Sequence, residues 1–311
     1  MATIPSQRSW VRTVVSPVRR VASWLAEAAA GTFRRSVADD ITGIASQFAY
    51  NAFLATVPFL FVLVSIIGLV AEPDTFDRFL SKDADNAIPV ELRDVLRNGL
   101  ASATRNTGQA AVFLAVGLLG ALYVSANVMG ALVGGLDRAR DVPHRSWVHG
   151  KLAAMAIAIA TSLLVVATTL ALVGGSRLVE SVAEELFGKG APNVAGRVLY
   201  LIGTASLLLF TIALYHVGPN APRRRILSDV PGAFVAVALW VGASRLFALY
   251  IENYKLYESV YGALGGAAIY LIFLFLTGVS LMIGAEVNEQ IHAMRVRRRG
   301  RGATTAPIDS G

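Results

Sequence analysis

The sequence predicts an all-α polytopic membrane protein, a bundle of six transmembrane helices with amphipathic surface helices. Three observations predict it. Hydrophobic residues make up 55% of the chain and charged residues only 16%, whereas a soluble domain carries about 25% charged residues. The charges crowd into the gaps between long uncharged stretches, which is typical of membrane spans rather than of a soluble core. Positive charge also alternates between successive gaps as a membrane topology requires.

Six segments have the composition of a membrane-spanning helix, which needs about 20 mostly apolar residues. The first two exceed the length of a perpendicular crossing, which indicates tilt. The fourth and fifth are separated by a turn with prolines at Pro219 and Pro222, which no helix crosses intact. The predicted spans are 43–71, 110–136, 152–174, 198–217, 230–250 and 263–287.

The distribution of lysine and arginine sets the direction of the spans. The N-terminal segment, the second–third loop, the fourth–fifth loop and the C-terminal tail hold 18 of the 28 lysines and arginines. Because loops rich in positive charge stay in the cytoplasm, we expect both termini to be cytoplasmic. Every loop agrees with this one alternating topology, and an odd number of spans would break the agreement.

The chain divides into three predicted parts. Residues 1–40 form a basic cytoplasmic segment, in which apolar residues recur from Val11 to Leu25 with arginines on other faces. This pattern predicts an amphipathic helix on the cytoplasmic leaflet, attracted to anionic membrane lipids. Residues 41–290 form the six-helix domain, and residues 291–311 are expected to be a basic disordered tail. Two more amphipathic helices are predicted on the outer face, near 92–100 and 178–186.

The residues for common catalytic sites are missing from the sequence. There is no cysteine, which excludes disulfides and thiolate metal sites. The four histidines lack metal-ligand spacing, and no phosphate-binding glycine loop or nucleophile elbow is present. We therefore expect no enzyme activity, no metal and no cofactor. The basic residues are concentrated in the segments that the topology places in the cytoplasm, so the positive net charge does not indicate nucleic acid as a partner.

Polar residues inside the predicted spans are the main candidates for a substrate path. Gln47 and Asn51 lie one turn apart and share a helix face, and Asn127 lies at a similar depth of roughly 10–13 Å from the cytoplasmic ends. Glu286 and Asn288 lie at the cytoplasmic end of the sixth span. Together they predict a polar cleft that opens to the cytoplasm. The alternative is that the amides only bond neighbouring helices, and that Glu286 is a helix-end carboxylate paired with a loop arginine.

Two other positions within the spans are candidates for the substrate path. Arg245 lies near the outer end of the fifth span. There its side chain either reaches the surface and pairs with Glu252 or Glu258, or contacts a lipid phosphate or other anion. Pro58 frees a carbonyl in the middle of the first span, which favours a kink.

An ordered set of short motifs resembles the YihY/BrkB family of bacterial inner-membrane proteins. The resemblance covers about residues 41–288. Its N-terminal part is the helix from Phe48 through Asn51 to Pro58. The C-terminal motif positions are Tyr215, Pro219 and Asn220, then Pro231, Gly232 and Ala233, then Trp240, Phe247 and Tyr250, then Tyr261, Gly262, Leu264 and Gly265, and finally Gly284, Ala285, Glu286 and Asn288.

The resemblance implies a six-helix fold in the bacterial inner membrane. Where family members often carry Trp in the last helix, this chain has Phe273 and Phe275, and Ala263 stands where Ser is common. Family members have also been linked to transport of envelope lipids or lipopolysaccharide precursors. The family has carried ribonuclease and virulence-factor labels. The ribonuclease label finds no support here, because no pair of histidines or carboxylates has a suitable spacing.

Two functions remain open from the sequence. The first is a transporter or flippase-like protein for an amphipathic, anionic lipid or envelope precursor, with the polar cleft as its path and Arg245 near the outer exit. The second is a non-transporting scaffold that recruits partners or anionic lipid through its basic termini. Glycine pairs such as Gly130/Gly134 permit close helix approach, so an oligomer is compatible with either function.

Overall fold

The computed structural model describes residues 7–70, 107–143, 145–164, 191–222, 224–253 and 255–303 of the chain. Every regular element in these ranges is a helix, in agreement with the predicted all-α class. The elements are α1 (Gln7–Ala38), α2 (Ile41–Val70), α5 (Thr107–Ala139), a helix at 147–164, α7 (Ala191–Val217), the short 3-10 helix η2 (Ile226–Ser228), α8 (Val230–Asn253) and α9 (Lys255–Ala303).

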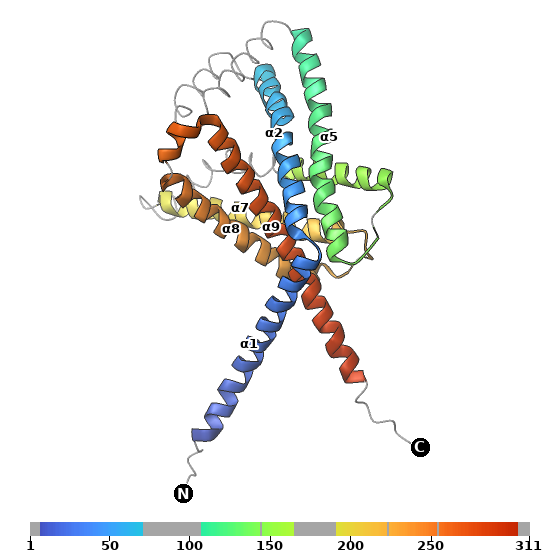
Figure 1. The fold of residues 1–311 in the computed structure, drawn as a ribbon, viewed down its shortest axis with the longest axis vertical. Coiled ribbons are helices and arrows are strands. Elements are labelled where there is room, and N and C mark those ends of the chain that lie inside the picture. The colour runs from blue at the N-terminus through green and yellow to red at the C-terminus, as the bar shows by residue number, and fades with distance from the viewer. Residues whose placement is uncertain are drawn as a thin grey trace.

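The helices pack around α9 and α2. α2 lies along α5, α8 lies along α9, and α9 also packs on α2. α1 packs on α9 near the start of α2 and then extends away from the other helices, as does the C-terminal part of α9, so both termini lie at the same end of the molecule (Figure 1). α7, α8 and helix 147–164 run across the direction of α2 and α5 (Figure 1). The described helices are therefore not a bundle of parallel rods.

Five of the described helices are long and apolar enough to cross a membrane, judged by length and composition. They correspond to the second to sixth predicted spans, and they cover Gly117–Ala139, Trp147–Leu164, Tyr200–Val217, Val230–Tyr250 and Gly265–Arg298. The first predicted span coincides with α2, whose 30 residues include no charged side chain. Six crossings with cytoplasmic termini remain a prediction.

The ends of the chain differ from expectation in one respect. We predict a disordered tail from residue 291, but α9 continues as a helix to Ala303, so that prediction is wrong for 291–303. Packing supports the first turn of this extension: Ile291 and Met294 are buried, and Gln290 contacts α1 at Gly31, while residues 295–298 are exposed. Composition alone does not reveal that this segment has a neighbouring helix. The predicted outer helices near 92–100 and 178–186 lie outside the described residues.

A tight turn joins α1 to α2. Asp40 adopts a left-handed backbone with φ of 51°, a conformation that Asp tolerates better than most residues. Its carboxylate accepts hydrogen bonds from the backbone N–H of Gly43 at 3.1 Å and from the Thr42 hydroxyl at 3.2 Å. Asp40 thus caps the first turn of α2, where backbone N–H groups lack helical partners. The turn fixes where α1 leaves the other helices.

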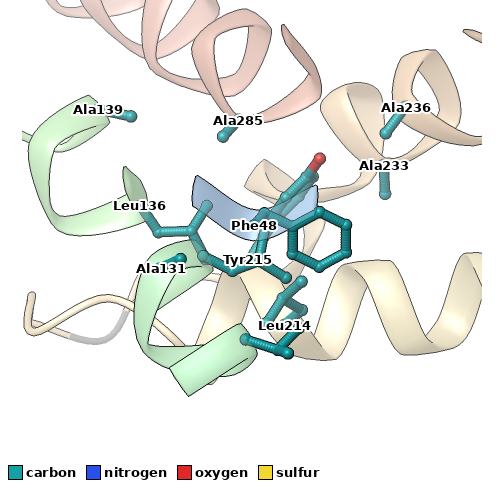
Figure 2. Close-up of a cluster of buried hydrophobic side chains, with 11 residues drawn as sticks. Phe48, Ala131, Leu136, Ala139, Leu214, Tyr215, Ala233, Ala236 and Ala285 are labelled. Carbon is teal, nitrogen blue, oxygen red and sulfur yellow. The ribbon is translucent and has the colours of Figure 1, made fainter. Parts of the chain in front are cut away.

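The buried core lies where five helices meet, and small side chains dominate it. α2 contributes Phe48, and the other helices contribute many alanines, so their backbones approach closely. Tyr215 from α7 is the largest fully buried side chain of the described residues. The cluster comprises Phe48, Val128, Ala131, Leu132, Leu136, Ala139, Leu214, Tyr215, Ala233, Ala236 and Ala285 (Figure 2).

Candidate functional site

α8 and α9 touch backbone to backbone at two glycines. A Cβ added to Gly232 would lie 2.0 Å from the carbonyl oxygen of Gly284, and one added to Gly284 would lie 2.5 Å from the carbonyl oxygen of Gly232. Any side chain at either position would therefore push the helices apart. This contact explains why glycines occupy two of the family-motif positions, and it brings the start of α8 against α9.

Asn288 of α9 holds the N-terminus of α8. Its Oδ1 accepts a hydrogen bond from the Gly232 N–H at 2.7 Å, and its Nδ2 donates to the Asp229 carbonyl at 3.0 Å. N–H groups in a first helical turn have no intrahelical partner, and Pro231 has none to satisfy. Asn288 is buried, so its amide serves as a cap supplied by a second helix.

Tyr215 makes a third link to α9. Its hydroxyl donates to the backbone carbonyl of Leu281 at 2.5 Å, and its own backbone carbonyl accepts from Arg140 at 2.7 Å. The tyrosine therefore joins α7 to α9 and to the end of α5. Because the side chain is 1% exposed, the hydrogen bond also satisfies a polar group that would otherwise be costly to bury.

An ion cluster lies beside these contacts. Arg140, which follows α5, contacts Asp229 at 2.8 Å and Glu289 of α9 at 3.2 Å. Arg224 adds a second cation to Glu289 at 2.7 Å, and His216 contacts Asp229 at 3.0 Å. The Arg140, Asp229 and Glu289 side chains are each less than a tenth exposed. Burial raises the pKa of the Asp229 carboxyl, while His216 and Arg140 oppose that rise.

A separate ion pair joins α1 to α9. The Arg35 Nε donates to Glu286 at 3.0 Å, and the Arg35 guanidinium also donates to the Ala139 carbonyl at 2.6 Å. Asp141 lies 3.4 Å from the same guanidinium but is 80% exposed. Burial lowers the pKa of Arg35, but the carboxylates of Glu286 and Asp141 outweigh burial and raise it. Glu286 is fully buried, and the Asp39 carboxyl directly after α1 lies close enough to interact with it.

The turn after α7 is held by α5 and the loop that follows α5. The buried Asp137 accepts from the Asn220 backbone N–H at 2.6 Å, and the Asn220 side chain donates to the Pro143 carbonyl at 3.1 Å. Arg145 donates to the carbonyls of Gly218 and Pro219. Prolines cannot extend α7, so these bonds replace the missing helical partners. The family-motif residues Pro219 and Asn220 are thus positions of chain reversal.

A small cavity of about 10 Å³ lies at the meeting point of these groups, with Arg140, Tyr215, Asn288 and Glu289 among its lining residues. A volume of this size is close to that needed for one water molecule. The arrangement is a neutralised polar network rather than an open binding pocket.

The predicted cleft residues have separate partners. Asn51 donates to the carbonyl of Gln47 in its own helix at 2.7 Å, and Gln47 is exposed. Asn127 of α5 accepts a hydrogen bond from Lys151. Glu286 pairs with Arg35. The described contacts therefore do not join these residues into one cluster, and a substrate path through them remains a prediction.

The remaining predicted positions are placed as follows. α2 is one helix through Pro58, and a Cβ added to Gly120 of α5 would lie 3.6 Å from Pro58. Arg245 is exposed on α8, and its pairing with a glutamate stays a prediction. Tyr261 and Gly262 lie within the first two turns of α9.

The sequence interpretation missed the cations and carboxylates at the loop ends. Arg35, Arg140 and Arg224 were counted only as topology signals, although each binds a buried carboxylate. Asp229 and Glu289 were not singled out. One available signal was their proximity in sequence to the motif residues Pro231 and Asn288. Their pairing across distant segments required the fold.

The comparisons with known proteins agree with this helical architecture. The family described as "Virulence factor BrkB" matches residues 32–309. A UPF0761 membrane protein of Pseudoalteromonas translucida is 28% identical over 82% of both chains. A UPF0761 membrane protein of Alkalilimnicola ehrlichii is 31% identical over 84% of this chain and 57% of its own length.

A third relative carries a different label. The "Putative ribonuclease-like protein YfkH" of Bacillus subtilis is 26% identical over 79% of this chain and 88% of its own length. No solved structure matches the chain. The family match spans most of the sequence, including α2, α5, α7, α8 and α9. The chain therefore belongs to the BrkB family and is an integral membrane protein with several transmembrane helices.

Proposed function

We propose that the protein is a transporter or flippase-like protein for an amphipathic, anionic lipid or envelope precursor. The observation that carries the proposal is the buried Glu286, which directly follows the uncharged run 265–285 of α9 and pairs with Arg35 of α1. An ionisable side chain in a membrane helix is expensive to bury, and such residues commonly mark substrate or ion pathways.

The geometry supports a simple exchange at Arg35. The guanidinium is bound by Glu286, by the Ala139 carbonyl and by the exposed Asp141. An anionic headgroup that approaches along the exposed side of Arg35 can compete with these carboxylates for the same donors, because guanidinium groups bind carboxylates and phosphates alike. Loss of the pair would release α1 from α9, which gives two states that a substrate can bias.

The test compares substitutions of the two carboxylates that contact Arg35. Purified protein is reconstituted into liposomes with a labelled anionic lipid, and translocation is followed by quenching of the outer leaflet. We expect Glu286→Gln to change the rate by about tenfold, because the neutral amide competes less well with the headgroup for Arg35 and about 1.4 kcal/mol corresponds to a factor of ten. Asp141→Asn, which removes the exposed carboxylate 3.4 Å from Arg35, should change the rate much less, because water screens an exposed ion pair.

Two results contradict transport. One is a folded Glu286→Gln protein that moves lipid as fast as wild type. The other is a wild-type protein that moves none of several anionic lipids, with or without an imposed proton gradient.

The scaffold function is favoured by a different observation, the exposed face of α1. Val21, Leu25, Phe33 and Val37 are each more than half exposed, and their separations of four and eight residues make a slowly winding apolar stripe. Arg19 and Arg34 are exposed on the same helix. Such a helix suits an anionic membrane surface. If the protein is a scaffold, the double variant Val21→Ser/Leu25→Ser cannot replace the wild-type protein in cells, whereas the Glu286→Gln variant can.

A further inference from the structure

We propose that Lys151 is a binding site for the phosphate of an anionic lipid headgroup, positioned by Asn127 and Tyr123. The Lys151 Nζ donates to the Asn127 side-chain oxygen and lies 4.5 Å from the centre of the Tyr123 ring. Asn127 and Tyr123 lie one turn apart on α5, so both reach the lysine from one helix face. Lipid binding here does not depend on whether the protein moves lipid.

The described partners of Lys151 differ from those of three partly buried arginines. Arg35, Arg140 and Arg224 each face a carboxylate within 3.2 Å. The partners that the structure describes for Lys151 are a neutral amide and an aromatic face. An ammonium group has three N–H donors, and the amide oxygen accepts one of them. These partners therefore orient the ammonium group but do not neutralise its charge. An anion would neutralise the charge and accept the remaining N–H donors.

The surroundings favour a lipid over free phosphate. Trp147 and Val148 are exposed by 81% and 55%, and their positions four and three residues before Lys151 put them on the same side of helix 147–164 as the lysine. The next residue, Leu152, is 59% exposed. Tyr123 is also exposed, by 63%. In the stretch Trp147–Leu164, Lys151 is the single Lys, Arg, Asp or Glu. A cation bordered by apolar and aromatic side chains suits a lipid, because the cation can bind the anionic headgroup while the apolar side chains contact the acyl chains.

The experiment measures binding by the full chain in a neutral detergent. Fluorescent phosphatidylglycerol is titrated and compared with phosphatidylcholine of the same acyl chains. We expect preferential binding of phosphatidylglycerol, and Lys151→Gln should weaken it about five- to tenfold, as expected for one basic contact to an anionic lipid. Lys151→Arg should retain most of the affinity. Arg225→Gln, which removes one exposed loop charge, is the charge-matched control and should behave as wild type.

Several outcomes overturn the proposal. Equal loss in Lys151→Gln and Arg225→Gln would show diffuse attraction rather than a site. Equal binding of the two lipids by wild type would remove the role of charge. Displacement of the lipid by millimolar inorganic phosphate would assign the site to free phosphate. Thermal unfolding of each variant checks that it is folded. Tyr123→Leu removes the aromatic ring but keeps the lysine, and this variant should also bind phosphatidylglycerol more weakly.

Discussion

At the residue scale, two glycines of the family motifs have a steric role that another glycine of α8 lacks. Gly232 and Gly284 stand where two backbones meet, so a Cβ has no room. Gly242 on the same helix as Gly232 has no atom within 4 Å of an added Cβ. The sequence shows all three alike. Only the position of the neighbouring helix distinguishes them.

This contrast gives a prediction with an internal control. Gly232→Ala should destabilise the protein by about 1–3 kcal/mol, because overpacking a tight contact costs that much. Gly242→Ala should be neutral or slightly stabilising, since alanine favours helix by about 1 kcal/mol over glycine. Thermal unfolding in detergent, followed by circular dichroism, measures both. A similar melting temperature for the two variants would contradict the close contact.

Asn288 gives a second prediction at this scale. Asn288→Ala removes the cap from α8 and leaves the Gly232 N–H without its described partner. A buried donor left without a partner costs about 1–3 kcal/mol, so unfolding should occur at a lower temperature. If Asn288→Ala unfolds as wild type does, the amide has another role. Asn51→Ala is the comparison, because that amide bonds only its own helix in the described contacts and its loss should cost less.

At the scale of the elements, an ion pair contributes to the position of α1. Arg35 contacts both α9 and the end of α5. The buried Thr32 and Ser36 flank it on the same helix. Removing one charge leaves the other buried without its counter-ion, which is the costly case for buried ion pairs. Replacing both with apolar residues avoids that cost.

A double-mutant cycle tests this contribution. Arg35→Met alone should destabilise by about 3–5 kcal/mol, as breaking a buried pair does. The double variant Arg35→Met with Glu286→Leu should recover much of the loss. Stability is measured by denaturant titration in detergent micelles. Additive effects would mean that the two side chains do not interact, contrary to the 3.0 Å contact.

At the scale of the whole molecule, charge and length predict the topology while the structure supplies only relative positions. Both termini lie at one end (Figure 1), which is compatible with two cytoplasmic ends. In the same view α7, α8 and helix 147–164 run across α2 and α5. The membrane side of each loop is therefore best measured directly.

The chain suits cysteine labelling because it contains no cysteine of its own. Ser6→Cys and Ser228→Cys should react with a membrane-impermeant maleimide only after the cells are opened. Ser102→Cys and Ser181→Cys should react in intact spheroplasts, because their loops carry fewer lysines and arginines per residue than the two predicted cytoplasmic loops. Labelling of Ser228→Cys from outside would invert the predicted fourth and fifth spans.

The sequence by itself determined the membrane class, the all-α composition, the approximate helix ranges and the family. Each follows from local properties: a span needs about 20 apolar residues, and the residues of 230–250 show this without their neighbours. The tertiary structure decided which polar groups meet. Arg35 and Glu286 are 251 positions apart, and no local pattern connects them. It also decided that Asn51 bonds its own helix, that Asn127 binds Lys151, and that residues 291–303 are helical. Burial and pairing depend on which helix lies opposite, because a buried charge or a missing Cβ has meaning only against the atoms that surround it.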